Sequence, residues 1–555
     1  MKWGGGGGTK KFAPRTIHSR THQKEEQKHP KMATSNTSAG GGVATDDVTS
    51  HHHKVTSSVL RSRLEKLHKS LGGGGGFDEF VRGITSALAP PAADSDWTRP
   101  LNEYFISSSH NTYLTGHQLY GSSTTEGYIN VLERGCRCIE IDVWDGDDGE
   151  PEVFHGYTLT KEISFKDVCK AVGKHAFTTG GEGPVMISLE CHAGPQQQKR
   201  VVEIMQKEWG DMLVQGIAPE DVAELPSPQA LRRKILVKAK YLPPPPQAPT
   251  AVVSTTAPRE RARDSSSSSS DEELDELAKS NNKQKPPKIK VTRALASLGI
   301  YCSSHHFPAQ APRPFTEHPT SKIPNHVYSF SEKVFASLHA QHAEDMFTHN
   351  KSHLMRVYPF GLRFSSSNAD PTDFWRRGVQ LVALNWQKCD EGMMLNEGMF
   401  AGEGGYILKP PSFRPGTGVS PAQDKKTLDL TIQVLAAESI PLPEKSDSAK
   451  HFEPYVKIEV HATATPLKKK TKAKRHTECV WDETIEFKKV SDVIEKLTFV
   501  RFKIHDEEFG KDDLAAWACI RLDRLLEGYR FIHLIDNEGN PSKGVILVKI
   551  TKKIY

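Results

Sequence analysis

Four segments in the first half of the chain share one pattern, in which a run of apolar or β-branched residues ends in polar side chains. The segments read NEYFISSSHNTYL, CRCIEIDVWDG, EVFHGY and PVMISLECH. The polar residues that follow the apolar runs are His110, Asn111, Glu140, Asp142, His155 and Glu190. Barrel and open α/β enzymes place their chemistry at the carboxyl ends of successive strands. The pattern therefore predicts that the chain is an enzyme.

Strand-like and helix-like segments alternate over residues 98–242 and again over residues 291–412. The candidate strands are EYFISS, CRCIEID, EVFHG, PVMISLE, KILVKA, HVYSFS, LMRVYP and VQLVALNW. Eight strands interleaved with helices predict an α/β fold of the (β/α)8 barrel type. Residues 243–290 hold four consecutive prolines, a run of six serines and the acidic string DEELDEL. This composition predicts a disordered linker, which interrupts the barrel after its fifth strand.

The pattern changes to strands alone after a short linker at residues 413–426. Residues 427–555 contain the strand-like runs LDLTIQVLAAE, YVKIEVHATA, TIEFKK, LTFVRFKIHD, AWACIRLD and GVILVKIT. Regular spacing of such runs, with polar loops between them, predicts an all-β sandwich.

The amino-terminal region has a different character. Residues 1–76 hold two glycine runs separated by His, Ser, Thr and Lys, which predicts a disordered head because little apolar surface is available for burial. One amphipathic helix is expected within it, between Val55 and Leu71. Residues 77–97 contain a second helical pattern, FDEFVRGITSAL, and a turn that leads to the first strand.

Composition narrows the cellular setting. No apolar run approaches the roughly 20 residues that a membrane span needs, and no signal-peptide pattern opens the sequence. The eight cysteines include no CxxC pair, which favours a reducing compartment. We therefore expect a cytoplasmic protein. The formal net charge of +5 on 555 residues identifies no partner by itself.

The polar residues at the strand ends fall into two chemical groups. Asn111, Glu140, Asp142 and Glu190 would supply one carbonyl oxygen and three carboxylates, which are the ligands of a hard cation. These residue types leave calcium and magnesium both open. His110 and His155 remain for proton transfer, because imidazole titrates near neutral pH.

Longer strings resemble a known family. SSSHNTYL, GCRCIEIDVWDG, EVFHGYT, ISLECH, LPSPQALRRKILVKAK, SHLMRVYPFGLRFSSSN and VQLVALNWQ resemble the eukaryotic phosphoinositide-specific phospholipases C, most of all the delta type. Residues 98–242 and 291–412 correspond to the X and Y catalytic halves, and residues 427–555 resemble the C2 domain. The sequence shows no pleckstrin-homology domain and no EF-hand loop; residues 77–97 resemble only the last helix of the EF-hand region. Cys191 stands where the family usually has Asn.

The resemblance implies an activity and a role for each candidate residue. The activity is calcium-dependent hydrolysis of phosphatidylinositol 4,5-bisphosphate to diacylglycerol and inositol 1,4,5-trisphosphate, through a cyclic phosphate. The implied Ca²⁺ ligands are Asn111, Glu140, Asp142 and Glu190. His110 would stabilise the transferring phosphate, and Glu140 is a candidate general base. His155 would protonate the leaving oxygen or contact the phosphate, and the sequence leaves both roles open.

The resemblance also implies how the protein would meet a membrane. Lys238, Lys240, Ser331 and Arg356 match ligands of the 4- and 5-phosphates, and Tyr358 would stack on the inositol ring. Apolar rim positions that would dip into the bilayer are Leu119, Tyr157, Leu159, Leu338 and Leu362. The expected partner is thus the phosphoinositide substrate at an anionic membrane surface on the cytosolic side, with no nucleic acid. The basic string KKKTKAKRH in the sandwich could add contacts to anionic lipid.

Two alternative functions compete with this interpretation. One is a catalytically weak or inactive relative that only binds lipid or partners, but the chain keeps both histidines and all four ligand positions. The other is an enzyme of the short bacterial kind that acts on phosphatidylinositol alone, against which Lys238, Lys240 and Arg356 argue.

We also expect the acidic linker to repel anionic membranes, so that deleting residues 255–285 raises activity on anionic vesicles.

Overall fold

The computed structural model describes residues 53–92, 96–156, 158, 160–216, 224–242, 290–307, 314–444, 449–508 and 510–555. The expected linker, apart from Lys290, and the head up to residue 52 lie outside the described residues, so the expectations for both remain predictions. In the described part of the chain, every helix is too short or too polar to span a bilayer.

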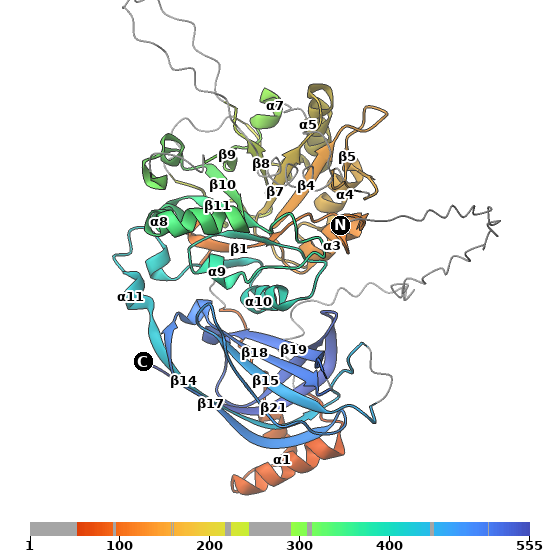
Figure 1. The fold of residues 1–555 in the computed structure, drawn as a ribbon, viewed down its shortest axis with the longest axis vertical. Helices are drawn as coiled ribbons and strands as arrows, with labels where there is room; N and C mark the ends of the chain where they lie inside the picture. Colours follow the sequence, from red (N-terminus) through yellow and green to blue (C-terminus); the bar gives the residue numbers. More distant parts are fainter. Residues whose placement is uncertain are drawn as a thin grey trace, which may run out of the picture. The chain divides into compact units, whose positions relative to one another are not determined.

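The described residues form a closed barrel of eight parallel strands, as the sequence predicts (Figure 1). Around the barrel the order is β1, β4, β7, β8, β9, β10, β11 and β12, and β1 pairs with both β12 and β4. The bounds are β1 Tyr104–Ser109, β4 Cys138–Trp144, β7 Val185–Cys191, β8 Ile235–Lys240, β9 Ser303–His305, β10 His326–Ser331, β11 Leu354–Tyr358 and β12 Leu381–Leu384. A short strand, β13 (Tyr406–Leu408), pairs antiparallel with β1.

One expected barrel strand is not part of the barrel. The segment EVFHG forms only β5 (Glu152–Val153), which pairs antiparallel with β4 and with β6 (Ile163–Ser164) as a hairpin extension. The missing barrel strand is β9, a three-residue strand without an apolar run, which hydrophobic patterning does not reveal. The linker therefore follows the fourth barrel strand, and the expectation that it follows the fifth is wrong.

Helices and short turns pack around the barrel. They are α3 Thr125–Glu133, α4 Phe165–His175, α5 Pro195–Trp209, α7 Arg293–Ala296, α8 Glu332–Ser352, α9 Thr372–Trp375 and α10 Glu391–Phe400. Ser164 caps α4 and Ser331 caps α8, because each hydroxyl accepts a hydrogen bond from a backbone amide of the first turn. Outward-facing strand residues such as Ile139 and Ile187 share one apolar cluster with Val168 and Val201 on these helices.

The carboxyl-terminal residues form the expected all-β sandwich. Its described strands are β14 Lys426–Glu438, β15 Pro454–His461, β16 Leu467–Lys470, β17 Cys479–Val493, β18 Phe499–Asp506, β19 Asp513–Arg521, β20 Gly528–Asp536 and β21 Pro541–Ile554. The order is β16-β15-β18-β19-β20-β21-β14-β17. Only two residue pairs join β19 to β20, so the sheet folds there into two layers around one core. The sequence did not predict β16 or β20.

The described part of the amino-terminal head is ordered, contrary to the expected disorder of residues 1–76. Helix α1 (Ser58–Ser70) buries Leu60, Leu64 and Leu67 against the outer face of the sandwich. The carboxylate of Glu438 accepts a 2.8 Å hydrogen bond from the Ser57 backbone amide, just before the helix begins. The helix has little core of its own, so packing against another element stabilises it. The narrower expectation of one helix between Val55 and Leu71 is correct.

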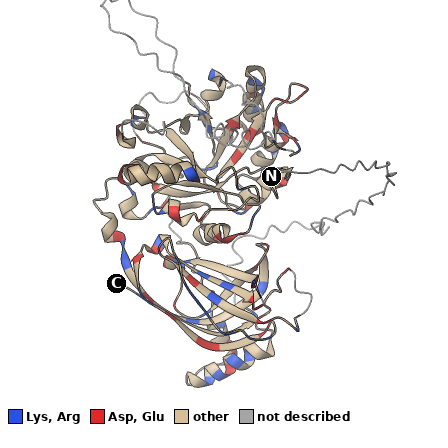
Figure 2. Cartoon of the chain, in the orientation of Figure 1, with Lys and Arg blue, Asp and Glu red and all other residues tan. Residues whose placement is uncertain are grey.

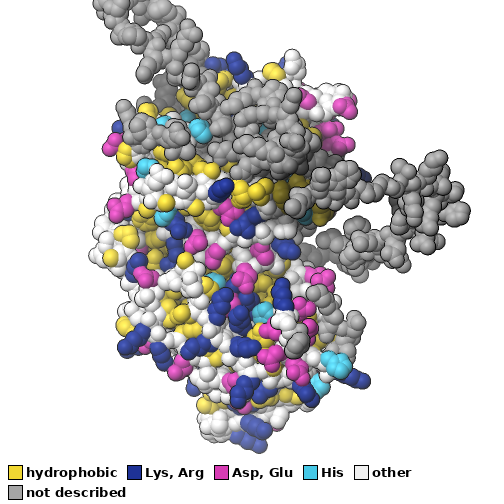
Figure 3. All heavy atoms as spheres, in the orientation of Figure 1, with side chains coloured by type: hydrophobic (Ala, Val, Ile, Leu, Met, Phe, Trp, Pro, Cys, Tyr) yellow, Lys and Arg dark blue, Asp and Glu magenta, His cyan; other side chains and the backbone are white. Residues whose placement is uncertain are grey.

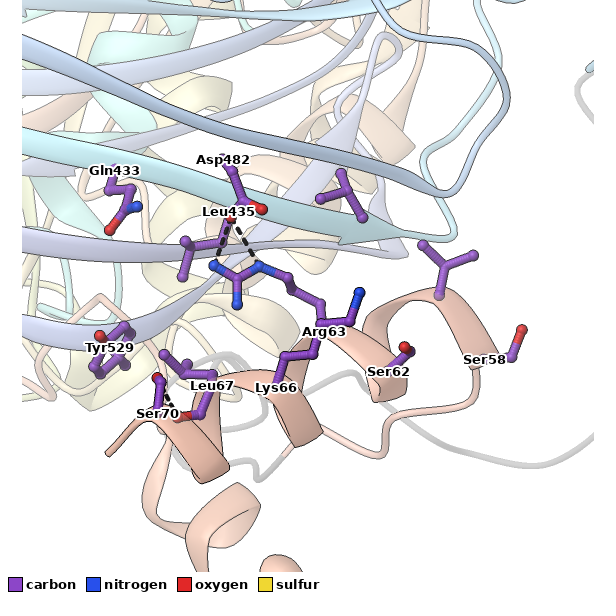
Figure 4. A pocket seen from close by; sticks show the side chains of 12 residues that line it. Ser58, Ser62, Arg63, Lys66, Leu67, Ser70, Gln433, Leu435, Asp482 and Tyr529 are labelled. Atoms are coloured by element: carbon purple, nitrogen blue, oxygen red, sulfur yellow. Dashed lines mark hydrogen bonds and ion pairs between the residues drawn. The ribbon is translucent and has the colours of Figure 1, made fainter. Parts of the chain in front are cut away.

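The exposed side of α1 carries basic residues (Figure 2). Arg63 forms an ion pair with Asp482 of β17, with 2.6 Å between Nη2 and Oδ1. The two residues line an open hollow of about 830 Å³ between the helix and the sheet (Figure 4).

The next helix, α2 (Phe77–Gly83), ends earlier than the predicted Leu88. Residues beyond it are extended because their backbone pairs with the sandwich, at Ser86 with Phe531 and at Leu88 with Leu525.

Candidate active site

The barrel strands carry the candidate residues in layers. Side chains alternate along a strand, so residues two and four positions beyond an inward-facing residue also face inward. The apolar inward layer consists of Ile106, Cys138, Met186, Leu236, Val327, Leu354 and Leu381. Two positions further along lie Ser108, Glu140, Ser188, Lys238, Ser329, Arg356 and Ala383. Four positions further lie His110, Asp142, Glu190, Lys240, Ser331, Tyr358 and Asn385. The residues predicted on barrel strands therefore meet at the carboxyl end of one barrel.

Two buried ion pairs connect predicted substrate ligands with predicted metal ligands. The Arg356 guanidinium lies 2.7 Å from Oε1 of Glu140. The Lys238 ammonium lies 3.1 Å from Oε1 of Glu190 and 3.2 Å from the Ser188 hydroxyl. The sequence predicted each residue at the site but not these pairings. Each cation has a carboxylate within reach, which offsets the cost of burying its charge.

The neighbouring charges also determine the charge states of Glu190 and Arg356. Burial alone would raise the pKa of Glu190, but the charges of Lys238, Arg356 and His192 outweigh it and lower the pKa to about 2. Burial would likewise lower the pKa of Arg356, yet Glu140 and Glu190 raise it above its usual value. Glu190 is therefore ionised at neutral pH and Arg356 is charged.

Asn111 and Asp142 complete the predicted metal ligands. Asn111 follows the first barrel strand with a φ of 42°, a left-handed conformation that Asn adopts more readily than most residues. Its backbone amide donates a 2.9 Å hydrogen bond to Oε2 of Glu140. Asp142 accepts a 2.6 Å hydrogen bond from the Tyr113 hydroxyl. Burial, followed by the charge of Asp142, raises the pKa of Tyr113 well above its usual range, so the tyrosine remains a hydrogen-bond donor.

The four ligands suit an oxygen-preferring cation. Glu140 and Asp142 are two residues apart on β4, and Asp142 is paired in register with Glu190 on β7, so the carboxylates project from neighbouring positions. Among the described residues, no three His, Cys, Asp or Glu side chains converge as a complete metal cage. Arg356 and Lys238 hold two of the carboxylates instead. The oxygen donors are nevertheless of the kind that calcium and magnesium both prefer, and the three buried carboxylates outnumber these two buried cations.

Both candidate catalytic histidines are buried and oriented through Nδ1. His110 Nδ1 lies 3.0 Å from Oδ1 of Asn385, and the His110 ring is parallel to Tyr358 with centroids 6.1 Å apart. His155 lies on the loop after β5, not at the end of a barrel strand as expected. Its Nδ1 lies 2.8 Å from the backbone carbonyl oxygen of Gln118. The site thus presents two histidines at one barrel mouth.

The sequence does not predict several residues that lie at the site. Gln118 and Ser366 lie on loops, where no periodic pattern marks them, and both are buried. Asn385 directly follows β12, so the rule that places polar residues at strand ends could have identified it.

The remaining predicted phosphate ligands lie at the strand ends. Lys240 is the last residue of β8 and is half-buried, and Ser331 is the last residue of β10. The Ser331 hydroxyl accepts a 3.4 Å hydrogen bond from the Val334 amide and so caps α8.

The predicted apolar rim is only partly at the surface. Leu362 is 47% exposed and Leu119 is half-buried. Leu338 is 2% exposed, because it lies on the buried face of α8, so its assignment to the rim is wrong. Tyr157 and Leu159 lie outside the described residues.

The charged residues of the sandwich are largely paired with one another. In the basic string KKKTKAKRH, Lys470 lies 3.0 Å from Glu507 and Arg475 lies 3.1 Å from Glu453. The Asp512 carboxylate accepts a 2.6 Å hydrogen bond from Tyr455. Basic and acidic side chains also lie intermixed over the face of the sandwich seen in Figure 3.

Comparison with known proteins is consistent with this geometry. Models for the X and Y domains of phosphatidylinositol-specific phospholipase C match residues 97–241 and 295–412, and a C2 domain model matches residues 428–536. Together they cover the eight barrel strands and the sandwich up to the end of β20.

Similar proteins include 1-phosphatidylinositol 4,5-bisphosphate phosphodiesterase delta-3 of Mus musculus, 37% identical over 82% of this chain and 57% of its own length. Delta-4 of Homo sapiens is 40% identical over 80% of this chain and 59% of its own length. This chain thus spans less than two thirds of these relatives. The crystal structure of S. officinalis PLC21 superposes with a TM-score of 0.71 at 27% identity, covering 93% of this chain and 67% of that chain. The chain belongs to the phosphatidylinositol-specific phospholipase C family, and its similar relatives include delta types.

Proposed function

We propose that the protein is a calcium-dependent phospholipase C that cleaves phosphatidylinositol 4,5-bisphosphate to diacylglycerol and inositol 1,4,5-trisphosphate. The observation that carries the proposal is the meeting of three residue sets at one barrel mouth. The sets are two histidines, four oxygen ligands and a group of cations that includes Lys238 and Arg356. The printed names of the relatives, which are phosphodiesterases of this lipid, support the substrate.

The first step is an attack by the inositol 2-hydroxyl oxygen on the phosphorus of the 1-phosphate. A new O–P bond closes the cyclic phosphate while the bond to the diacylglycerol oxygen breaks. In this proposal Glu140 would receive the hydroxyl proton, and His155, in its doubly protonated form, would give a proton to the leaving oxygen. When bound, calcium would lower the pKa of the attacking hydroxyl and offset phosphate charge. In the second step water opens the ring, with the proton transfers reversed.

The charged phosphates would be bound by groups that already face the site. Lys238 and Arg356 rise from the layer of side chains below the strand ends. Lys240 and Ser331 lie one layer higher, and Ser331 is paired in register with Tyr358, whose ring would stack on the inositol. An Arg supplies a two-pronged contact to phosphate and a Lys supplies a point charge. His110, held against Asn385, would contact the transferring phosphate and stabilise its charge.

The proposed setting is the cytosolic face of a membrane. The exposed Leu362 could enter the bilayer beside the barrel mouth while the bisphosphorylated head group enters the site. A peripheral enzyme of this kind meets its substrate only at the membrane surface, so the partner is an anionic bilayer that contains the phosphoinositide.

Product analysis tests the proposal. The full chain would be incubated, with free calcium, with vesicles that contain either phosphatidylinositol 4,5-bisphosphate or phosphatidylinositol. We expect diacylglycerol and inositol trisphosphate, with some cyclic product, and faster turnover of the bisphosphorylated lipid. Release of inorganic phosphate instead, or no product at all, would contradict the proposal. Preference for phosphatidylinositol would contradict the roles of Lys238, Lys240 and Arg356.

A further inference from the structure

Gln118 contacts the predicted metal ligand Asn111, the candidate catalytic residue His155, and Asn385, which is the partner of His110. Its Oε1 accepts a 2.9 Å hydrogen bond from Nδ2 of Asn111. Its Nε2 donates to Oδ1 of Asn385, at 3.2 Å, and to the Ser366 hydroxyl, at 2.9 Å. Its backbone carbonyl oxygen lies 2.8 Å from Nδ1 of His155. The residue is buried, so these contacts are not exchanged freely with water.

The bond to Asn111 determines which atom that side chain can offer to a cation. An amide presents an oxygen that can ligate a hard cation and a nitrogen that cannot. Gln118 accepts from the Asn111 nitrogen, so the Asn111 oxygen remains as the group able to ligate calcium. Without an acceptor at this place, the Asn111 amide could rotate and present its nitrogen instead.

The same residue sets the tautomer of His155 and helps to set that of His110. The backbone carbonyl of Gln118 can only accept a hydrogen bond, so Nδ1 of His155 carries the proton. Asn385 Oδ1 accepts from Gln118 Nε2 at 3.2 Å, and the Asn385 amide nitrogen donates to the Ser367 carbonyl oxygen at 3.3 Å, so the two contacts together orient the Asn385 amide. His110 must therefore also be protonated at Nδ1. In the neutral form each ring then keeps Nε2 as its basic nitrogen.

We propose that Gln118 is a positioning residue that aligns the metal ligand Asn111 with the tautomers of His110 and His155. The inference rests on the proposed function and extends it, because it identifies one side chain that couples metal binding to proton transfer. Its side-chain amide acts on Asn111 and His110, whereas its backbone acts on His155. Partners that orient metal ligands typically change metal affinity or activity by 10- to 100-fold when they are mutated.

Two variants separate the two arms of the side chain. Gln118→Leu removes both the acceptor for Asn111 and the donor to Asn385. Gln118→Glu keeps an acceptor for Asn111 but loses the donor. The matched control is Gln387→Leu, because Gln387 donates a 3.2 Å hydrogen bond to the same Ser366 hydroxyl from a half-buried position. Thermal melting of each variant establishes that it is folded.

Calcium titration by calorimetry on the substrate-free full chain provides the first measurement. We expect Gln118→Leu to bind calcium about 10- to 100-fold more weakly, while Gln118→Glu and Gln387→Leu bind at least nearly as tightly as wild type. In hydrolysis assays at saturating calcium, Gln118→Leu should lower kcat about 10- to 100-fold with little change in KM, since the phosphate ligands are intact. Wild-type calcium affinity and kcat in a folded Gln118→Leu variant would overturn the proposal.

The tautomers provide a second, independent measurement. Nitrogen NMR of histidine-labelled protein distinguishes a ring protonated at Nδ1 from one protonated at Nε2. We expect both variants of Gln118 to change the His110 signal and to leave the His155 signal at Nδ1, because that bond is to the backbone. An unchanged His110 signal in the Gln118 variants, or an equal change in Gln387→Leu, would overturn the claim that Gln118 positions His110. Failure of wild type to hydrolyse the lipid would instead contradict the proposed function, and the substrate-free measurements would still decide the role of Gln118.

Discussion

Arg356 and Glu140 form a buried ion pair across the mouth of the barrel, with 2.7 Å between Nη2 and Oε1 and side chains 1% and 5% exposed. Glu140 belongs to β4 in the X half and Arg356 belongs to β11 in the Y half. These strands are not neighbours in the sheet. The pair therefore connects the two halves of the catalytic domain through its interior.

Removing one member of this pair should destabilise the protein. Arg356→Ala leaves the Glu140 carboxylate buried without its main cation, a change that typically costs about 3–5 kcal/mol. We expect denaturant unfolding to show a loss of this size. The double variant Arg356→Met with Glu140→Gln should recover part of it, because no buried charge is left unpaired. Equal stability of Arg356→Ala and wild type would show that the pair does not form.

The buried histidines behind the barrel predict a pH dependence of stability. The His326 and His353 rings stack 4.6 Å apart, and those of His349 and His353 stack 4.7 Å apart, between the strands and α8. Burial, followed by the charges of His353 and His305, lowers the pKa of His326 to about 2. Burial also lowers the pKa of His349 well below its usual value. At neutral pH all of these rings are thus uncharged in the folded protein.

Below about pH 6.5 the unfolded chain binds protons that the folded chain cannot, so stability falls as pH falls. Each fully buried ring should contribute about 1.4 kcal/mol per pH unit to that loss. His349→Gln should therefore reduce the loss between pH 5.5 and pH 4.5, where the unfolded histidine is almost fully protonated, by roughly that amount. Urea unfolding at several pH values measures it, with the exposed His451→Gln as control. Identical pH slopes for wild type and His349→Gln would show that His349 is not buried as described.

Docking of α1 on the sandwich should be visible in its stability. Leu64 is fully buried in the cluster shared with Leu435 and Leu547. Leu64→Ala should cost about 2–5 kcal/mol locally, because it leaves a cavity. Hydrogen exchange would then accelerate in residues 58–70, whereas Arg61→Ala, an exposed change on the same helix, should have little effect. Fast exchange of α1 in wild type would support the original expectation of a disordered head.

The two candidate catalytic histidines should be necessary for turnover. General acid–base catalysis contributes about 10²- to 10⁴-fold, so His110→Ala and His155→Ala should each lose at least about that much activity. Initial rates on vesicles and on a soluble head-group substrate would measure the loss, with melting temperatures as the control for folding. Near wild-type rates for both variants on both substrates would contradict the roles assigned to them.

Much of the site could be predicted because its residues follow long apolar runs. Each candidate on a barrel strand lies two or four positions beyond an inward-facing apolar residue, so strand periodicity alone aims these side chains into the barrel mouth. The count of eight barrel strands was also correct. The identity of one barrel strand was predicted wrongly. EVFHG has an apolar pattern but forms a hairpin, whereas β9 is a barrel strand without such a pattern.

The features that could not be predicted depend on contacts between distant segments. The pairing of Lys238 with Glu190 follows from the register of β7 and β8, which the sequence does not specify. The wrong assignment of Leu338 to the rim has the same cause. The sequence does not show that this residue lies on the buried face of α8. The exposed β16 has the sequence LKKK, in which no apolar alternation marks a strand, and pairing with β15 gives it its structure.

The central claim is that the chain hydrolyses phosphatidylinositol 4,5-bisphosphate with calcium bound by Asn111, Glu140, Asp142 and Glu190. The most direct test measures inositol phosphate release from vesicles across a series of free calcium concentrations, for wild type and Glu190→Gln. We predict no release by wild type in excess chelator, a saturable rise with calcium, and a higher calcium requirement for the folded variant. Full wild-type activity in excess chelator, or an unchanged calcium requirement in Glu190→Gln, would contradict the account.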